Sequence, residues 1–232
     1  MLFLRELHSV KGAQQLDFEA LYRDGWQSRL RENGLGRLLW FLDQAHGSGL
    51  AYRAVTITAI NGGAAWEELA RRVQRGDLSE WAHEADRLRY HVDAALLAPV
   101  AWSPLQPAEI EDQQTATAAG VDPVLYMEDT VSPHPGRVDD YIAAAGDVYT
   151  PSMASRGLLS LRAAFRATTA GGHRGEVVLL QRIDDQERLL ALLADETAPE
   201  HHHPESWMRR ALAWRDSWRS RLLRTAPWSP LR

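Results

Sequence analysis

The sequence feature that most constrains the fold is an internal repeat. Shifting the chain by 126 positions aligns Ser79–Leu105 with Glu205–Leu231 without a gap, and nine of the 27 aligned positions are identical. Trp81 falls on Trp207, and the tetrapeptide Trp-Ser-Pro-Leu ends both segments. Because tryptophan is rare, these matches indicate that the chain holds two copies of one fold.

A stripe of apolar residues runs through each aligned segment with spacings of 7, 4 and 4 positions. This spacing predicts one amphipathic helix in each copy, and we interpret the stripe as core packing of helix on sheet rather than as an aromatic ligand platform. Pro99 and Pro227 would end the two helices. The stripe residues are Trp81, Leu88, Val92 and Leu96 in the first copy and Trp207, Trp214, Trp218 and Leu222 in the second.

Each copy is predicted to run strand, helix, strand, strand, helix, strand. Strands at 2–7 and 124–131 open the copies, and helices at 16–33 and 136–153 follow them. Trp-Ser-Pro-Leu is predicted to be the short last strand of each copy, at a sheet edge where proline is tolerated. We therefore predict a first repeat over 1–106, a polar linker over 107–122 and a second repeat over 123–232.

A βαββαβ unit forms a four-stranded antiparallel sheet with both helices on one face, so its other face must be covered. Two units in one chain can cover each other, sheet against sheet. The predicted class is α+β, with two fused ferredoxin-like βαββαβ repeats whose sheets face each other as a pseudo-dimer around a barrel-like interior.

This architecture resembles the tandem dimeric α/β-barrel superfamily. The stretch "LRELHSVKG", the tryptophan-containing helix after it and the glycine–tyrosine approach to the next strand are similar to the NIPSNAP and EthD branch. Members include cofactor-independent monooxygenases, polyketide cyclases, isomerases and haem-binding enzymes. The resemblance implies a fold more directly than an activity, because one fold carries many chemistries.

Composition excludes several classes of site and partner. The chain has no cysteine, which rules out disulfides, thiolate metal sites and a cysteine nucleophile. Its net charge of −5 gives no indication of nucleic-acid binding. The apolar start before Arg5 is too short for a signal peptide or a membrane span. We expect a cytoplasmic protein with no membrane partner, which could form a homodimer of the tandem chain.

Candidate catalytic residues follow from the expectation that ligand lies in an apolar lumen between the sheets. Glu6 and His8 share one face of the first strand, and Glu128 is predicted to occupy the place of Glu6 in the second repeat. A carboxylate in an apolar lumen has a raised pKa and can act as a general base. His8 could relay the proton, and Arg162 could hold an anionic oxygen of the substrate. The alternative is that these groups form structural ion pairs or lie at the sheet rim.

Aromatic and basic residues on the same strands are predicted to bind substrate. These residues are Trp40, Tyr52, Tyr126 and Arg166.

Histidine spacing gives little support for a metal. His201, His202 and His203 are consecutive, so they cannot all face one ion from a regular element, and we predict a loop. His173 lies in a hairpin turn and is a weak candidate for a haem ligand. Phosphate-binding and hydrolase motifs are absent from the sequence.

The sequence therefore predicts a small-molecule enzyme acting on a hydrophobic, aromatic or polyketide-like substrate by proton transfer, without a cofactor. A cofactor-independent monooxygenase and a cyclase or isomerase both fit. The alternatives are a non-catalytic protein that binds a small ligand or serves in assembly, and a haem-binding member of the superfamily.

Overall fold

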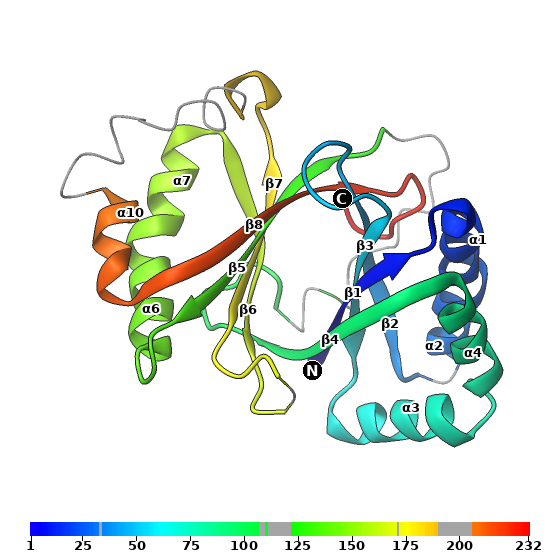
Figure 1. Ribbon diagram of the computed structural model, residues 1–232. Coiled ribbons are helices and arrows are strands. Elements are labelled where there is room, and N and C mark those ends of the chain that lie inside the picture. The colour runs from blue at the N-terminus through cyan, green and yellow to red at the C-terminus, as the bar shows by residue number, and fades with distance from the viewer. Residues whose placement is uncertain (33, 107–109, 111–121, 171, 190–205) are drawn as a thin grey trace.

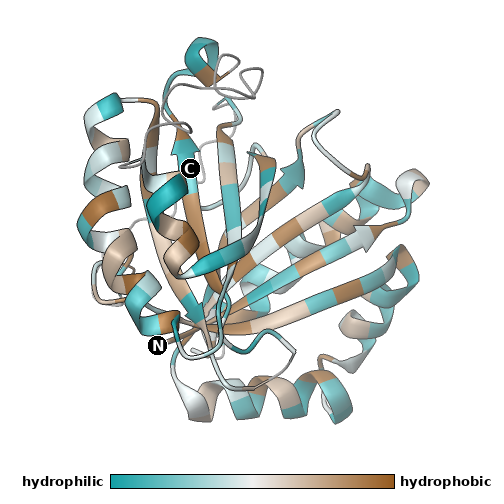
Figure 2. Cartoon of the chain, turned by 60° about the vertical axis from the view of Figure 1, so that its left-hand side comes forward, coloured by the Kyte–Doolittle hydropathy of each residue, from teal (hydrophilic) through white to brown (hydrophobic). Residues whose placement is uncertain are grey.

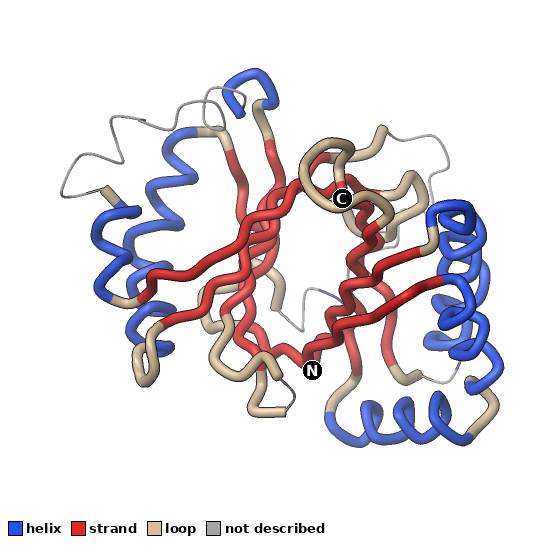
Figure 3. The backbone as a smooth tube through the Cα atoms, in the orientation of Figure 1, coloured by secondary structure: helices blue, strands red, loops and turns tan. Residues whose placement is uncertain are grey.

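The computed structural model describes residues 1–32, 34–106, 110, 122–170, 172–189 and 206–232. The predicted α+β class is confirmed. Eight antiparallel strands of the described chain close into one barrel, and the helices pack outside it on two opposite flanks (Figures 1 and 3).

The first repeat supplies one flank and four strands of the barrel. Its elements are β1 (Leu2–Val10), η1 (Gly12–Gln14), α1 (Gln15–Ala20), the π-helical η2 (Leu21–Trp26), α2 (Gln27–Glu32), β2 (Gly36–Gln44), β3 (Arg53–Ile60), α3 (Gly63–Arg75), α4 (Ser79–Leu88) and β4 (Arg89–Pro99).

The second repeat supplies the other flank. Its described elements are β5 (Leu125–Pro133), α6 (Val138–Ala144), the π-helical η3 (Ala145–Tyr149), α7 (Thr150–Arg156), β6 (Leu159–Ala167), β7 (Val177–Ile183), α10 (Trp207–Arg210), η4 (Ala211–Ala213) and β8 (Arg215–Thr225). Of the predicted linker, only Ile110 and Asp122 lie among the described residues, so that boundary stays a prediction.

The barrel has the strand order β1-β3-β2-β8-β5-β7-β6-β4 and is closed by two seams between the repeats. At one seam β2 pairs with β8, and at the other β4 pairs with β6. Each seam consists of three residue pairs, whereas β1 and β3 pair over eight positions. The seams therefore close the sheet with few hydrogen bonds, and side chains inside the barrel must contribute much of the contact between the repeats.

Strand register shows that the two repeats match residue by residue. Arg5 lies opposite Ile57, and Glu128 lies opposite Leu180, which gives an offset of 123 through the first three strands. The offset extends to the long helix, because both copies contain a π-helical segment and both end at a glycine with positive φ, Gly34 at 61° and Gly157 at 62°. For the last strand the offset is the 126 seen in the sequence.

The predicted last element of each repeat is wrong in its position. The helix α4 ends at Leu88, and residues 89–99 are a strand rather than a continuation of the helix. The second copy is similar, since Trp218 lies in the strand β8. A spacing of four fits one helical turn and also two strand repeats, so the stripe could not distinguish the two beyond Leu88.

Trp-Ser-Pro-Leu does not form a strand. In each copy its Trp and Ser end a turn that forms hydrogen bonds with a strand of the opposite repeat. In the first copy Val100 N donates to Ala164 O (3.1 Å) and Ala164 N donates to Ser103 Oγ (2.9 Å). The second copy repeats this pattern on β2: Ala226 N donates to Phe41 O (3.0 Å), and Phe41 N donates to Ser229 Oγ (3.1 Å). We call Val100–Ser103 and Ala226–Ser229 the clasp turns.

Each clasp turn binds its target strand just after a β-bulge. The register shifts between Leu38 and Trp40 in β2 and between Leu161 and Ala163 in β6. A bulge leaves backbone groups without a ladder partner. Phe41 and Ala164 lie directly beyond the last paired residue of each seam, so their backbone groups on that side have no strand partner. The serine hydroxyl satisfies this buried amide, which explains why serine stands in both tetrapeptides.

The interior of the barrel is filled by side chains. Phe3 and Phe165 meet with ring centroids 4.8 Å apart, and Trp40 and Tyr126 are buried beside them. Hydrophobic and hydrophilic residues alternate along the strands (Figure 2), because one face of each strand points into this core and the other toward the helices. The central space is thus a packed core, and a ligand site must be sought elsewhere.

Candidate functional site

The layer between helices and sheet is tightly packed in the first repeat. Trp26 and Trp81 stack with centroids 4.3 Å apart, and Tyr22 lies against both Phe18 and Phe41. Tyr22 is fully buried. These aromatic rings leave this layer filled.

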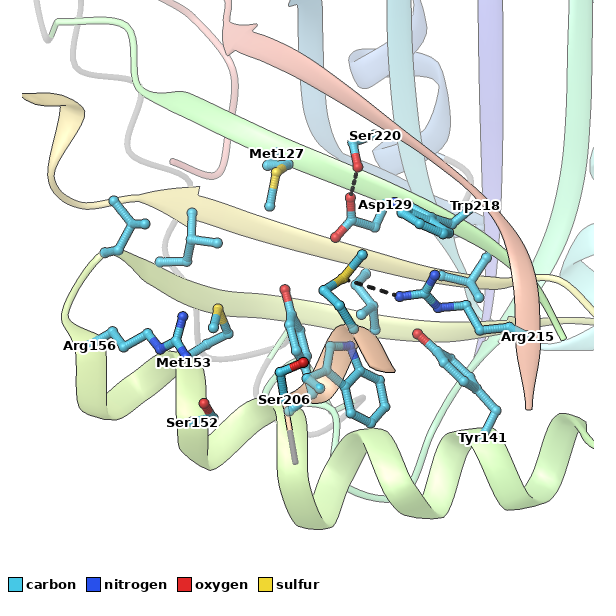
Figure 4. A pocket seen from close by; sticks show the side chains of 17 residues that line it. Met127, Asp129, Tyr141, Ser152, Met153, Arg156, Ser206, Arg215, Trp218 and Ser220 are labelled. Atoms are coloured by element: carbon cyan, nitrogen blue, oxygen red, sulfur yellow. Dashed lines mark hydrogen bonds between the residues drawn. The ribbon is translucent and has the colours of Figure 1, made fainter. Parts of the chain in front are cut away.

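The same layer in the second repeat contains a cavity of about 320 Å³. It lies between the outer face of the sheet and the segment 141–159, with 206–208 at one side (Figure 4). Its wall is mainly apolar, with Asp129, Arg156 and Arg215 as charged groups. The other lining residues are Met127, Val131, Tyr141, Tyr149, Ser152, Met153, Leu158, Leu159, Leu179, Ser206, Trp207, Met208, Trp218 and Ser220.

Differences in side-chain volume between the copies account for the looser packing. The offset of 123 places Ala145 at the position of Tyr22 and Ala164 at the position of Phe41. The stacked Trp26–Trp81 pair has as its counterpart Tyr149 and Trp207, whose rings are tilted with centroids 5.4 Å apart. The second layer therefore has smaller side chains at these positions of the same backbone frame, and it is open there where the first is filled.

Asp129 is the carboxylate of the cavity wall. It accepts hydrogen bonds from Ser220 Oγ (2.5 Å) and Gln181 Nε2 (2.9 Å). Burial raises the pKa of Asp129, while the two hydrogen bonds and the charge of Arg215 act in the opposite direction. A carboxylate with a raised pKa facing an apolar cavity is suited to take up a proton.

Tyr149 and Gln181 hold Asp129 in place. The Tyr149 hydroxyl donates to Gln181 Oε1 (2.6 Å), so the amide must turn its Nε2 toward the carboxylate. Burial, and after it the charge of Asp129, keeps the pKa of Tyr149 well above its ordinary value, so the phenol stays a donor. The chain Tyr149–Gln181–Asp129 thus fixes the direction of the hydrogen bonds at the site.

Arg215 is the cation of the same wall. It is 3 % exposed and lies over the ring of Trp218, with the guanidinium carbon 3.9 Å from the ring centroid. Its Nη2 points to the sulfur of Met208 (3.5 Å), and its Nε and Nη1 have no hydrogen-bond partner among the described residues. Figure 4 shows the guanidinium between the side chains of Tyr141 and Trp218.

The predicted lumen position of Glu6 and His8 is wrong, because both face the helices. His8 is buried against Phe18 and Tyr22, and Arg89 Nη1 lies 3.0 Å from its Nδ1. Since arginine only donates, Nδ1 accepts and the proton sits on Nε2, which faces Thr56 Oγ1 at 3.1 Å. Burial, reinforced by Arg89, holds the pKa of His8 well below its ordinary value, so the ring is neutral.

Glu6 belongs to the same buried network. Tyr22 and Thr56 each donate to its Oε2 at 3.3 Å. Burial raises the pKa of Glu6. The counterpart of Glu6 is Asp129 and not Glu128, because the offset in this strand is 123. The one-residue error moved the predicted pair to opposite faces of the sheet.

Glu128 does lie inside the barrel, but in an ion-pair cluster. It accepts from Arg5 Nε (2.8 Å) and Nη2 (2.6 Å) and from Arg221 Nη1 (2.9 Å). Burial alone would raise the pKa of Glu128, but Arg5 and Arg221 together hold it below its ordinary value. Arg5 and Glu128 occupy matching positions of the two repeats, so the duplicated site carries opposite charges that pair across the interior.

The remaining predicted residues are not brought together. Trp40 and Tyr126 are buried inside the barrel, and Arg162 Nη2 donates to the carbonyl of Arg232 (3.3 Å). Tyr52 is 52 % exposed, and Arg166 pairs with Asp139 on the surface (2.9 Å). None of these residues lines the described cavity, and their predicted roles in binding remain untested.

Asp129 and Arg215 were missed by the sequence reasoning. A signal for Arg215 existed, because the repeat alignment places it on Arg89 while Leu212 replaces Asp86. An arginine that is retained after its acidic partner has been replaced indicates a changed role. Asp129 could have been found only from the correct register.

Only some of the histidines considered as metal ligands lie in the described part of the chain. His201–His203 lie outside the described residues, and the described part of the chain holds no cluster of three acidic, histidine or cysteine side chains arranged for a metal. His173 is engaged by Asp93 (2.7 Å) and Glu176 (2.9 Å). Among described helices, none is long and apolar enough to cross a bilayer.

Comparison with known proteins supports the fold. No protein-family model matches the chain, and no curated protein matches it in sequence. Among solved structures, an anthrone oxidase-like protein matches with a TM-score of 0.60 and 11% identity, over 97% of this chain and 91% of that one. A putative monooxygenase from Lactobacillus acidophilus NCFM matches with a TM-score of 0.57 and 12% identity, over 96% and 93%.

A heme-binding protein from Thermus thermophilus also matches, with a TM-score of 0.52 and 10% identity over 98% of this chain and 92% of that one. A NIPSNAP domain protein from Burkholderia xenovorans covers 45% of this chain at a TM-score of 0.38. The chain shares the dimeric α/β-barrel fold of ferredoxin-like repeats with the full-length matches, as the sequence predicted.

Proposed function

We propose that the protein is a small-molecule enzyme of oxygenase type that acts on a hydrophobic, aromatic substrate in the cavity of the second repeat. The observation that carries this proposal is Asp129, a partly buried carboxylate with a raised pKa that faces an apolar cavity and is oriented by Tyr149 through Gln181. The full-length structural matches named monooxygenase and anthrone oxidase-like agree with this type of chemistry.

In the first step Asp129 takes a proton from an acidic C–H next to an aromatic ketone. The electron pair of that bond moves onto the carbonyl oxygen and gives an enolate. Ser220 and Gln181 keep the carboxylate pointed into the cavity during the transfer. General-base catalysis of this kind contributes about 10²–10⁴-fold to a rate.

In the second step the enolate reduces molecular oxygen, the co-reactant. A C–O bond forms at the deprotonated carbon and gives a peroxide anion, which takes the proton back from Asp129. The hydroperoxide then loses the second hydrogen of that carbon together with hydroxide as water. The balance is CH₂ + O₂ → C=O + H₂O. The protein's contribution is to hold the planar anion in an apolar wall of methionine, leucine and tryptophan side chains.

The haem-binding alternative was tested against the donor groups of the cavity. The described lining contains no imidazole, and the sulfur of Met208 already accepts from Arg215. The described lining therefore lacks the proximal histidine that holds the haem iron in globins and peroxidases. We therefore route no step through a haem group.

The experiment measures oxygen uptake with anthrone as the probe and follows anthraquinone by absorbance. Asp129→Asn is expected to lower kcat/KM at least 100-fold. Glu6→Gln is the matched control, because Glu6 occupies the equivalent position in the packed repeat, and it should retain activity.

Three outcomes would contradict the proposal. Equal loss in both variants would show a structural effect. Binding of anthrone without oxygen uptake by the parent protein would favour a carrier. A Soret band that appears on titration with haem, and is required for turnover, would favour the haem alternative.

A further inference from the structure

Arg215 and Arg89 occupy equivalent positions in the two repeats, and the same local backbone geometry places both side chains. Arg89 opens β4 and Arg215 opens β8, and in each case a register shift precedes the pair with the first strand of the repeat, at Ser9/Val10 and at Ser132/Pro133. A bulge re-aims the neighbouring side chain. Both guanidinium groups consequently point into the layer between sheet and helices.

The partners of the two arginines differ. Arg89 is held by Asp86, whose Oδ1 accepts from Nε (3.0 Å) and Nη2 (2.7 Å), and by His8 Nδ1 at 3.0 Å. In the second repeat these two positions carry Leu212 and Val131. Both hydrogen-bond acceptors have thus been replaced by apolar residues, while the arginine has been kept.

A buried guanidinium in this state is costly. Arg215 is 3 % exposed, and burial lowers its pKa. Asp129 on the same wall offsets part of the charge, but its oxygens already accept from Ser220 and Gln181. The Tyr141 hydroxyl lies toward the guanidinium (Figure 4) and interacts with it electrostatically, but it makes no hydrogen bond of normal geometry with Nε or Nη1. Within the part of the chain that the structure describes, two N–H donors therefore remain without an acceptor at the wall of the cavity.

We propose that Arg215 is the anion-binding residue of this cavity, and that its ligands are planar aromatic compounds bearing a carboxylate or phenolate oxygen. Either donor that has no partner among the described residues, Nε or Nη1, would donate to the anionic oxygen, and the ring of Trp218 fixes the plane of the guanidinium. The apolar wall of Met127, Met153 and Leu179 would hold the aromatic body. This inference rests on the proposed function for the choice of cavity, but it concerns binding and not turnover.

The test is equilibrium binding, measured by tryptophan fluorescence and calorimetry in the absence of any reaction. 2-Naphthoate is compared with 2-naphthamide, which has the same shape and no charge. 4-Nitrophenolate is compared with 4-nitroanisole for the phenolate arm. The parent protein is expected to bind at least one anion ten-fold or more tightly than its neutral partner, as a charge-assisted hydrogen bond would give.

Variants assign the preference to one residue. Arg215→Gln and Arg215→Met should reduce the discrimination to less than two-fold, and Arg215→Lys should retain part of it. Arg89→Gln, the equivalent change in the other repeat, should leave it intact. Thermal unfolding of every variant shows which ones are folded.

The inference would be overturned by equal binding of anion and neutral partner in the parent protein, or by discrimination that persists in folded Arg215→Met. Anion binding without oxygen uptake would refute only the proposed oxygenase reaction. Oxygen uptake that does not depend on the charge of the ligand would refute only the role of Arg215.

Discussion

Replacing the two equivalent arginines by methionine should change stability in opposite directions. In Arg215→Met the unpaired charge leaves the protein and an unbranched apolar side chain of similar length takes its place. Two buried N–H groups that have no partner among the described residues cost about 1–3 kcal/mol each. Against this stands the loss of the Trp218 contact, about 1 kcal/mol, and of the attraction to Asp129. The net expectation is a stabilisation of about 1–2 kcal/mol.

Arg89→Met removes groups that are fully used. The pair with Asp86 is discounted because that carboxylate is 66% exposed, but His8 Nδ1 is buried and would lose its donor. A buried acceptor left without a partner costs about 1–3 kcal/mol, so we expect a destabilisation of about 2–3 kcal/mol in total.

The assay is urea unfolding with thermal unfolding as a second measurement. For a chain of this size 1 kcal/mol corresponds to about 2–4 °C in Tm. We expect Arg215→Met to raise Tm by about 3–6 °C and Arg89→Met to lower it by about 5–10 °C. If both changes lower Tm by similar amounts, Arg215 has a stabilising partner, and the reasoning about its free donors fails.

Three further predictions follow from particular contacts. Ser103→Ala and Ser229→Ala should each lower the free energy of unfolding in urea by about 1–3 kcal/mol, because each leaves a buried amide unpaired. The two losses should add in the double variant, since the seams are separate. A strongly non-additive result would show that the seams are coupled. Glu128→Gln should lower the free energy of unfolding by about 3–5 kcal/mol, because it leaves the charge of Arg5 uncompensated. The double change Arg5→Leu with Glu128→Leu should lower it less. A larger loss in the double variant would mean that the charges themselves are required for folding. Burial, reinforced by Glu19, raises the pKa of Asp43 from 3.8 to about 6. The stability contributed by this carboxyl is therefore full below its unfolded-state pKa and is lost as the pH rises through about 6. Asp43→Asn should stabilise the protein by about 1–3 kcal/mol above pH 7 and have little effect near pH 4, and a stability difference that does not change with pH would contradict this.

The sequence predicted the fold because the repeat and the strand patterns are local signals. It failed at Val92 and Leu96, where a spacing of four residues suits a strand as well as a helix. It also failed at Glu6, because it matched Glu6 with Glu128, an offset of 122, while the opening strands have an offset of 123. A slip of one residue in a strand exchanges the two faces, so Glu6 and His8 were assigned to the barrel interior although they face the helices.

The candidate site was harder to predict because it depends on what one repeat lacks. Ala145 and Ala164 carry no chemistry and gain meaning only beside Tyr22 and Phe41 of the packed copy. Arg215 stands out only when Leu212 and Val131 are compared with Asp86 and His8. Such a comparison needs the residue-by-residue register that the strands provide.

The clasp turns have a consequence for how the chain is made. Ser103 is synthesised 61 residues before Ala164, whose amide it binds. At about 5–20 residues per second, the first repeat waits roughly 3–12 s for that strand, and β2 waits longer still for β8. During this interval the edges of β2 and β4 are unpaired and can pair with another nascent chain. Chains on neighbouring ribosomes of one messenger RNA can then exchange their second repeats. Slower loading of ribosomes onto the messenger RNA would favour closure of the barrel within each chain.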